Sequence, residues 1–166
     1  MANVEELIFR NMDTNGDGTG TKNANGNYTT PDDFYFQSPY AVELHRMIIS
    51  IGDTGGMTAE EYGNLGVALT NGWELKVKTA ADVVKLDLTD GIPIKSNAEL
   101  GRVCFDVELK DFGTTPTNEI LLARWTFARC GSPLILDPLD KLVITFSDNL
   151  TGLLTHYFMV QGLRLV

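Results

Sequence analysis

Asp13 begins the stretch of the sequence in which residue types and spacing come nearest to a metal-binding loop. Asp13, Asn15 and Asp17 alternate along the segment DTNGDG, and Gly18 stands in sixth place. In the front half of a calcium loop, alternating oxygens converge on the ion and a glycine in sixth place permits the sharp turn. Position twelve is Ala24, where a bidentate glutamate should complete the shell. We therefore predict flexible turns and no EF-hand, with calcium at this loop as the alternative.

The remaining groups that could do chemistry are isolated in the sequence. His45 and His156 each fall inside an expected strand, and no acid or nucleophile neighbours either of them in a known catalytic pattern. The triplet at 130–132, CGS, matches a fragment of the papain-type nucleophile motif, but Pro133 breaks the match. A serine elbow and a phosphate-binding glycine loop are both absent from the sequence. We expect no catalytic residues, no cofactor and no enzymatic activity.

Composition and charge narrow the classes of partner. The 166 residues carry a net charge of -9, and the 13 lysines and arginines are scattered singly, which argues against nucleic acid as a partner. No apolar run is long enough for a membrane span, and Glu5 and Glu6 stand where a secretory signal would be basic and then apolar. Cys104 and Cys130 lack the spacing of a zinc site, so we interpret both as reduced packing residues.

The polar N-terminal segment contrasts with the rest of the chain. Sixteen of the twenty residues in 11–30 are Asn, Thr, Gly or Asp. Such a segment buries too little apolar surface to offset the entropy of ordering its backbone. We therefore predict an extended arm over residues 1–33, which orders only on contact with a larger surface, and a separate β domain over residues 34–166. Within the arm, Val4–Arg10 could form one short helical turn.

The β domain shows short apolar alternations joined by Gly, Asn and Asp turns, and no long helical periodicity. The clearest strand is Trp73–Lys78, in which every second residue is apolar. The expected strands are 34–36, 41–51, 73–78, 83–88, 102–109, 121–130, 142–146 and 156–165. This number and spacing of strands predicts an all-β, two-sheet β-sandwich of jelly-roll type. Trp73 and Trp125 are in phase with aliphatic neighbours and are expected in the core, whereas Tyr40 and Tyr62 are better surface candidates.

Several segments resemble the decoration or cement proteins on the heads of tailed bacteriophages from marine and cyanobacterial viruses. The segments that carry the resemblance are DTNGDGTGTKNANGNY (13–28), EYGNLGVALTN (61–71), LTDGIPIKSN (88–97), RWTF (124–127) and NLTGLLTHYFMVQG (149–162). The resemblance implies a β-sandwich protein that binds the outside of an assembled capsid, often as a homotrimer, and clamps neighbouring capsid subunits.

The resulting functional prediction is a non-enzymatic virion structural protein on the capsid exterior, assembled in the host cytoplasm. Its expected partners are the major capsid protein and further copies of itself, with no nucleic acid and no membrane. The residues expected to bind these partners are Val4, Leu7, Ile8, Phe9, Asn15, Asn23, Asn25, Asn27 and Tyr28. The apolar members would anchor the arm, and the polar members would adapt to the shell.

Three other functions remain open from the sequence. A carbohydrate-binding module on the virion surface would need exposed, coplanar aromatic rings. A tail or connector component would share the structural signatures of a head protein. A hydrolase on the sandwich would need a pocket that joins His45 or His156 to a carboxylate or to Cys130.

Overall fold

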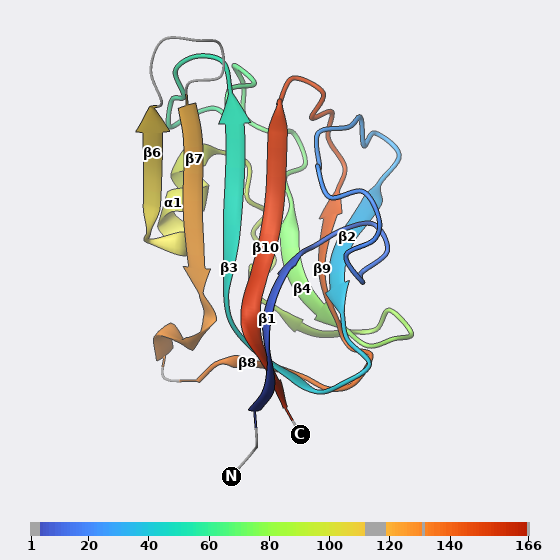
Figure 1. The fold of residues 1–166 in the computed structure, drawn as a ribbon. Helices are drawn as coiled ribbons and strands as arrows, with labels where there is room; N and C mark the ends of the chain where they lie inside the picture. The colour runs from blue at the N-terminus through green and yellow to red at the C-terminus, as the bar shows by residue number, and fades with distance from the viewer. Residues whose placement is uncertain (1–3, 112–118, 131, 166) are drawn as a thin grey trace.

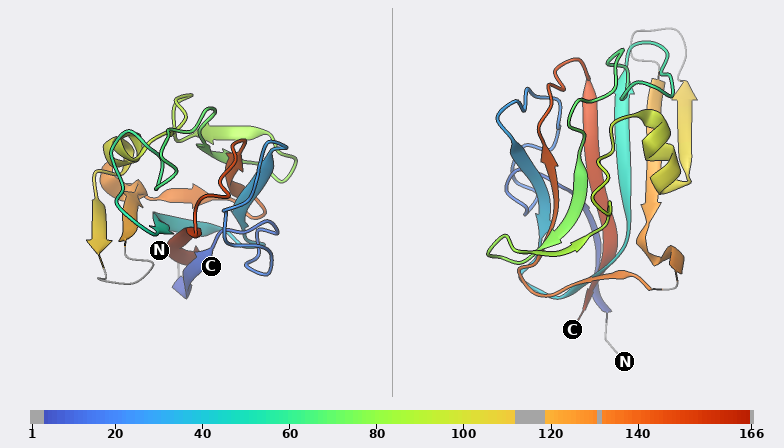
Figure 2. Two further views of the ribbon diagram at one scale, coloured as in Figure 1. Left: turned by 90° about the horizontal axis from the view of Figure 1, so that it is seen from above. Right: turned by 180° about the vertical axis from the view of Figure 1, so that it is seen from behind.

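The protein folds into two antiparallel β-sheets that pack face to face (Figures 1 and 2). The computed structural model describes residues 4–111, 119–130 and 132–165. Sheet A contains, in spatial order, β1 (Val4–Asn11), β10 (Thr155–Leu165), β3 (Val42–Asp53), β7 (Glu119–Thr126) and β6 (Val107–Asp111), with β8 (Leu134–Leu136) also paired to β3. Sheet B contains β2 (Asp32–Gln37), β9 (Lys141–Phe146), β4 (Glu74–Lys78) and β5 (Val84–Asp87). The described helices are α1 (Asn97–Cys104) and the short 3₁₀ helix η1 (Phe127–Cys130).

The strand order is that of a jelly roll. β1 pairs with β10, β2 with β9, β3 with β7 and β4 with β5, so that the first four strands meet later strands in reverse order. Successive pairs of this long hairpin go to alternate sheets, which is how eight strands form a jelly roll. The prediction of an all-β, two-sheet, jelly-roll-like sandwich is confirmed. β6, β8 and α1 are additions to the eight-strand pattern.

The core lies between the two sheets, because alternate residues of each strand point inward. The inward side chains that show this most clearly are Trp73, Leu75, Val77, Leu142, Ile144, Phe146, Phe158 and Val160. Trp73 beside β4 meets Phe158 of β10 edge-on, with ring centroids 5.3 Å apart, so this pair connects sheet B to sheet A. The sequence prediction that both tryptophans belong to the core is therefore confirmed.

The strand expected over residues 102–109 is wrong in its first half. The chain forms α1 there, and Ser96 caps the helix by accepting a hydrogen bond from the Glu99 N–H at 3.2 Å. Phe105 ends the helix in the left-handed conformation with φ of 57°, and β6 begins only at Val107. The serine followed three residues later by glutamate is a capping signal, and in this segment it outweighs the apolar alternation. Cys104 is buried on this helix, as a packing residue should be.

The expected helical turn at Val4–Arg10 is also wrong, because this segment is strand β1. It pairs with β10 along its length, from Val4 opposite Leu165 to Asn11 opposite Met159. Figure 1 shows β1 at one margin of sheet A, beside β10. A short apolar segment that is marginal as an isolated helix gains a complete set of ladder hydrogen bonds on one side when it joins a sheet.

The described part of the predicted arm, residues 4–33, belongs to the sandwich and is not a separate extension. Met12 and Ala24 have no exposed surface, and Tyr28 is buried against the aromatic core. The backbone N–H of Ala24 donates to the His156 carbonyl at 2.8 Å, and that of Tyr28 donates to the Asp148 carbonyl at 3.0 Å. The composition argument failed because hydrogen bonds to later segments and three well-spaced core side chains order this segment, despite its low apolar content.

Candidate functional site

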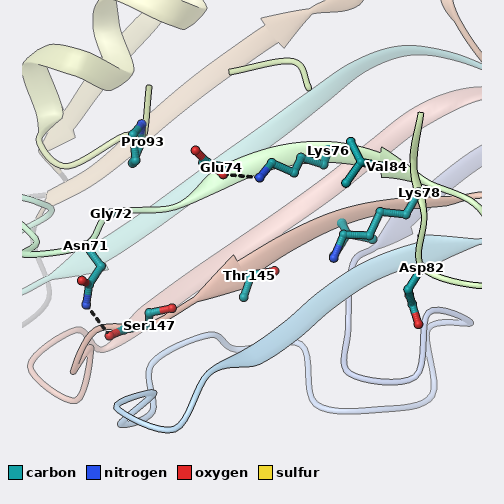
Figure 3. A pocket seen from close by; sticks show the side chains of 11 residues that line it. Asn71, Gly72, Glu74, Lys76, Lys78, Asp82, Val84, Pro93, Thr145 and Ser147 are labelled. Carbon is teal, nitrogen blue, oxygen red and sulfur yellow. Dashed lines mark hydrogen bonds and ion pairs between the residues drawn. The ribbon is translucent and has the colours of Figure 1, made fainter. Parts of the chain in front are cut away.

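A polar groove lies on the outer face of sheet B (Figure 3). Its volume is about 450 Å³. It runs along the outward-facing side of β4 and β9, because alternation turns the polar residues of these strands away from the core. The residues that line it are Asn71, Gly72, Glu74, Lys76, Lys78, Asp82, Val84, Pro93, Val143, Thr145 and Ser147.

Two ion pairs hold both acids of this groove, one inside the groove and one to Lys141 beside it. Lys76 forms an ion pair with Glu74, and this contact raises the pKa of the lysine ammonium. Lys141 lies 3.0 Å from Asp82 and lowers the pKa of that carboxyl group. These contacts favour the protonated form of Lys76 and the ionised form of Asp82. A general base needs a pKa near the working pH, so this arrangement is unsuited to proton transfer.

His156 lies at the centre of a buried chain of hydrogen bonds. The Trp73 indole N–H donates to the Tyr62 hydroxyl oxygen at 2.9 Å, and the Tyr62 hydroxyl lies 2.7 Å from His156 Nε2. His156 Nδ1 lies 2.8 Å from the Ala24 carbonyl oxygen. Because a carbonyl can only accept, Nδ1 carries the proton and Nε2 accepts from Tyr62. Every polar side-chain atom of this hydrogen-bond network therefore has a partner.

The environment of this hydrogen-bond network fits a structural role and does not fit proton transfer. Burial lowers the pKa of His156 to about 4, against a smaller opposing effect of the bond to Ala24, and burial also raises the pKa of Tyr62. Both side chains have no exposed surface, and neither ring contacts a carboxylate in the contacts described. His45 lies on the surface, with Nε2 2.9 Å from the Glu43 carboxylate. His45 lines a groove of about 320 Å³ on the outer face of sheet A, but Glu43 is not among the residues that line it, and His156 is fully buried.

The carboxylates of the calcium candidates Asp13 and Asp17 accept hydrogen bonds within their own loop. Asp13 is fully buried, and its carboxylate accepts from the backbone N–H groups of Asn15, Gly16 and Gly20 at 2.5 to 3.2 Å. The Asp17 carboxylate accepts from the backbone and hydroxyl of Thr19. These bonds close the loop with the same oxygens that would ligate an ion. The described residues include no cluster of three or more His, Cys, Asp or Glu side chains able to hold a metal.

Some of the predicted partner-binding residues are exposed to solvent, and others are buried or hydrogen-bonded within the fold. Leu7 and Phe9 are exposed, by 79% and 64%, on the outer face of β1. Asn15 and Asn27 are also exposed, and Val4 begins the strand. The residues that the fold already uses are Ile8 and Tyr28, which are buried, and Asn23 and Asn25, whose amides donate to the Leu153 and Leu154 carbonyls. These four serve the fold of the chain itself.

The aromatic side chains do not form a platform for sugar stacking. Trp73 is 1% exposed and Trp125 is 9% exposed. Tyr62, which the sequence suggested as a surface residue, is fully buried, whereas Tyr40 is exposed as expected. The Arg164 guanidinium covers one face of the Tyr40 ring at 3.3 Å from its centroid. The polar groove on sheet B has no aromatic lining residue.

The second exposed apolar surface lies on β6 and was missed in the sequence. Val107 and Leu109 are both exposed there, with Leu109 51% exposed, and they line a small groove with Met57 and Leu121. β6 is the end strand of sheet A opposite to β1. The sequence placed both residues in the strand expected over 102–109. Only the register of β6 against β7 shows that they stand at the margin of the sheet.

No helix in the part of the chain that the structure describes is long and apolar enough to cross a membrane. Comparison of the chain with protein-family models, with curated proteins and with solved structures finds no match.

Proposed function

We propose that the protein is a non-enzymatic structural component of a virion. In this proposal it binds the outer surface of a phage capsid as a decoration or cement protein and stabilises the contacts between capsid subunits. Its partners are the major capsid protein and further copies of itself. The sequence resemblance to such proteins supports the proposal, and so does the jelly-roll strand order, which viral capsid domains share with lectins and cupins.

The observation that carries the proposal is that sheet A exposes apolar side chains at both of its edges. Leu7 and Phe9 lie on β1, and Val107 and Leu109 lie on β6, at the two ends of the strand order. Edge strands are commonly protected by charge, proline or a covering segment, because exposed apolar edges lead to association. A protein that fastens to a lattice and to its own copies needs two separate contact surfaces, and these edges provide them.

The other observations favour binding over chemistry. The histidine that could act as a base, His156, is enclosed and fully bonded, and both acids of the sheet B groove, Glu74 and Asp82, form ion pairs with lysines. Glycan binding has no observation in its favour, because the two tryptophans that it requires are in the core. Attachment to a shell needs no bond to be made or broken, only complementary surfaces in many copies.

Binding to isolated shells tests the proposal. Purified protein is mixed with capsid shells of the source virus that lack it, and the bound fraction is measured by cosedimentation. We expect saturable binding at a fixed ratio to the major capsid protein, together with greater resistance of the shells to heat. The combined variant Val107→Ser and Leu109→Ser is expected to weaken binding by at least about tenfold, because it removes two apolar contacts.

The matched control is Ile92→Ser, which removes a side chain that is 69% exposed outside both edges of sheet A. This variant is expected to bind as the unchanged protein does. Absence of binding by the unchanged protein would overturn the proposed function. Equal binding by the β6 variant would overturn the assignment of that edge to the shell.

A further inference from the structure

Strand β1 forms backbone hydrogen bonds to β10 along one edge, and the backbone groups along its other edge are open. The Met12 N–H donates to the Phe158 carbonyl at 2.7 Å, which fixes which residues of the strand face β10. In an antiparallel ladder this direction alternates, so the backbone groups of Arg10 and Ile8 point to β10 as well. The N–H and C=O groups of Leu7 and Phe9 therefore point to the open edge. Within the described residues, no backbone hydrogen bond outside the β1–β10 ladder reaches them.

The open edge between Glu6 and Asn11 carries one acid, Glu6, and one base, Arg10. This segment contains no proline, glycine or lysine, and the register irregularity of β1 lies at its far end, between Val4 and Glu6. Both faces of β1 border a groove. One of about 320 Å³ runs from Leu7 and Phe9 over β10 to His45 of β3, away from the open edge, and one of about 190 Å³ borders Glu6 and Arg10 on the opposite face.

We propose that β1 is a self-association edge, at which two copies of the chain pair their β1 strands antiparallel about a two-fold axis through Ile8. In this register Leu7 of one copy lies opposite Phe9 of the second, and Glu6 lies opposite Arg10. Each contact occurs twice, as in every isologous interface. The open backbone groups of Leu7 and Phe9 then form the hydrogen bonds, and the two copies of sheet A become one continuous sheet.

The sequence of β1 favours this register over its neighbours. Centring the pairing on Leu7 places Ile8 opposite Glu6, and centring it on Phe9 places Ile8 opposite Arg10. Both arrangements set an apolar side chain against a charge. Only the register centred on Ile8 pairs apolar with apolar residues on one face and acid with base on the other, which are the favourable cross-strand combinations.

The two charged residues are suitably placed for this contact. Glu6 is exposed, and its carboxylate lies 3.6 Å from Arg164. The Arg10 guanidinium lies over the Phe36 ring at 5.4 Å from its centroid and forms no ion pair within the described residues. An approaching carboxylate would therefore find a cation without a competing acid in direct contact.

The proposal concerns the chain itself and does not depend on a capsid as the final lattice. It assigns Leu7 and Phe9 to the contact between copies and leaves the β6 edge for the other partner. It also predicts a two-fold pair, where the sequence resemblance implies a trimer. A mass of two chains and a mass of three chains are therefore opposing outcomes.

Charge reversal at the edge tests the proposal in solution. The full chain and the variants Glu6→Arg and Arg10→Glu are compared by sedimentation velocity over a concentration series. The unchanged protein is expected to reach the mass of two chains. Each single variant places like charges opposite one another at two positions and is expected to raise the dissociation constant by at least about tenfold.

Complementation then separates pairing from any effect on folding. The double variant Glu6→Arg with Arg10→Glu restores an acid opposite a base and is expected to regain pairing to within about threefold of the unchanged protein. A mixture of the two single variants is expected to form mixed pairs in native mass spectrometry, since one supplies two acids and the other two bases. The matched controls, Glu60→Arg and Arg102→Glu, change net charge equally at exposed positions and are expected to pair normally.

Three results would overturn the proposal. They are a single-chain mass at every concentration up to the solubility limit, an oligomer that charge reversal at β1 does not weaken, and single variants that form no mixed pairs. Failure of the proposed function would appear differently, as a protein that pairs in solution but does not bind the shells.

Discussion

The Tyr62 hydroxyl joins three parts of the core, and removing it should cost stability without changing the shape of the side chain. In Tyr62→Phe the Trp73 indole N–H loses its acceptor and His156 Nε2 loses its donor. Trp73 is 1% exposed and His156 has no exposed surface. Water therefore cannot replace the lost partner unless the core opens.

The expected loss follows from these two orphaned groups. A buried donor or acceptor that loses its partner costs about 1–3 kcal/mol, so the free energy of unfolding should fall by about 2–5 kcal/mol. This loss is a large fraction of the total stability of a domain this size, which is commonly about 5–15 kcal/mol.

Equilibrium unfolding in urea, followed by tryptophan fluorescence, measures this loss. The matched control is Tyr157→Phe on the outer face of β10, whose hydroxyl makes no hydrogen bond in the described structure, and we expect a change within about 0.5 kcal/mol. A decrease in the free energy of unfolding of less than about 1 kcal/mol for Tyr62→Phe, with an unchanged m value, would refute this reasoning. It would show that the hydrogen-bond network is not fully bonded and closed to water.

Two further predictions concern pH and a single carboxylate. Because burial lowers the pKa of His156 from 6.5 to about 4, the unfolded chain binds a proton that the folded chain does not in this window. Stability should therefore be constant above pH 7 and fall by about 3 kcal/mol between pH 6.5 and pH 4, and a flat urea midpoint between pH 7 and pH 5 would contradict this. The Asp148 carboxylate accepts from the backbone N–H groups of Thr70, Asn71 and Gly72. Asp148→Ala should cost about 2–4 kcal/mol and speed amide exchange at these residues, whereas equal exchange in both proteins would show that other groups hold the loop.

The sheet framework could be predicted from the sequence because it depends on local alternation. The segment that contains Leu75 and Val77 shows the period of two that a half-buried strand requires, and the structure buries both residues. The repetition of such segments indicated a jelly-roll-like sandwich, and the nested pairing of the strands agrees with that prediction.

The prediction of the N-terminal segment failed because its order comes from distant partners. Ala24 and Tyr28 sit among polar residues, and nothing near them in sequence shows that His156 and Asp148 will supply hydrogen bonds. The composition of a segment reflects its apolar side chains. It does not show the backbone hydrogen bonds that the segment forms with later parts of the sequence. The sequence around Asn23 and Asn25 likewise does not show that their amides donate to the Leu153 and Leu154 carbonyls.

The candidate contact surfaces were predictable only in part. The apolar character of Leu7 and Phe9 indicated a contact role, and the structure does expose both side chains. Their place on an open edge, and that of Leu109 on the opposite edge, depends on strand order, which one sequence does not show. The Ser96 cap could have been found, because serine three residues before Glu99 is a recognised helix start.

An electron cryomicroscopy map of the source particle tests the central claim most directly. The account predicts jelly-roll density on the outer surface of the capsid, with the β6 edge of sheet A against the shell and paired β1 strands between neighbouring copies. Density for this chain at the tail, inside the head or absent from the particle would contradict the account.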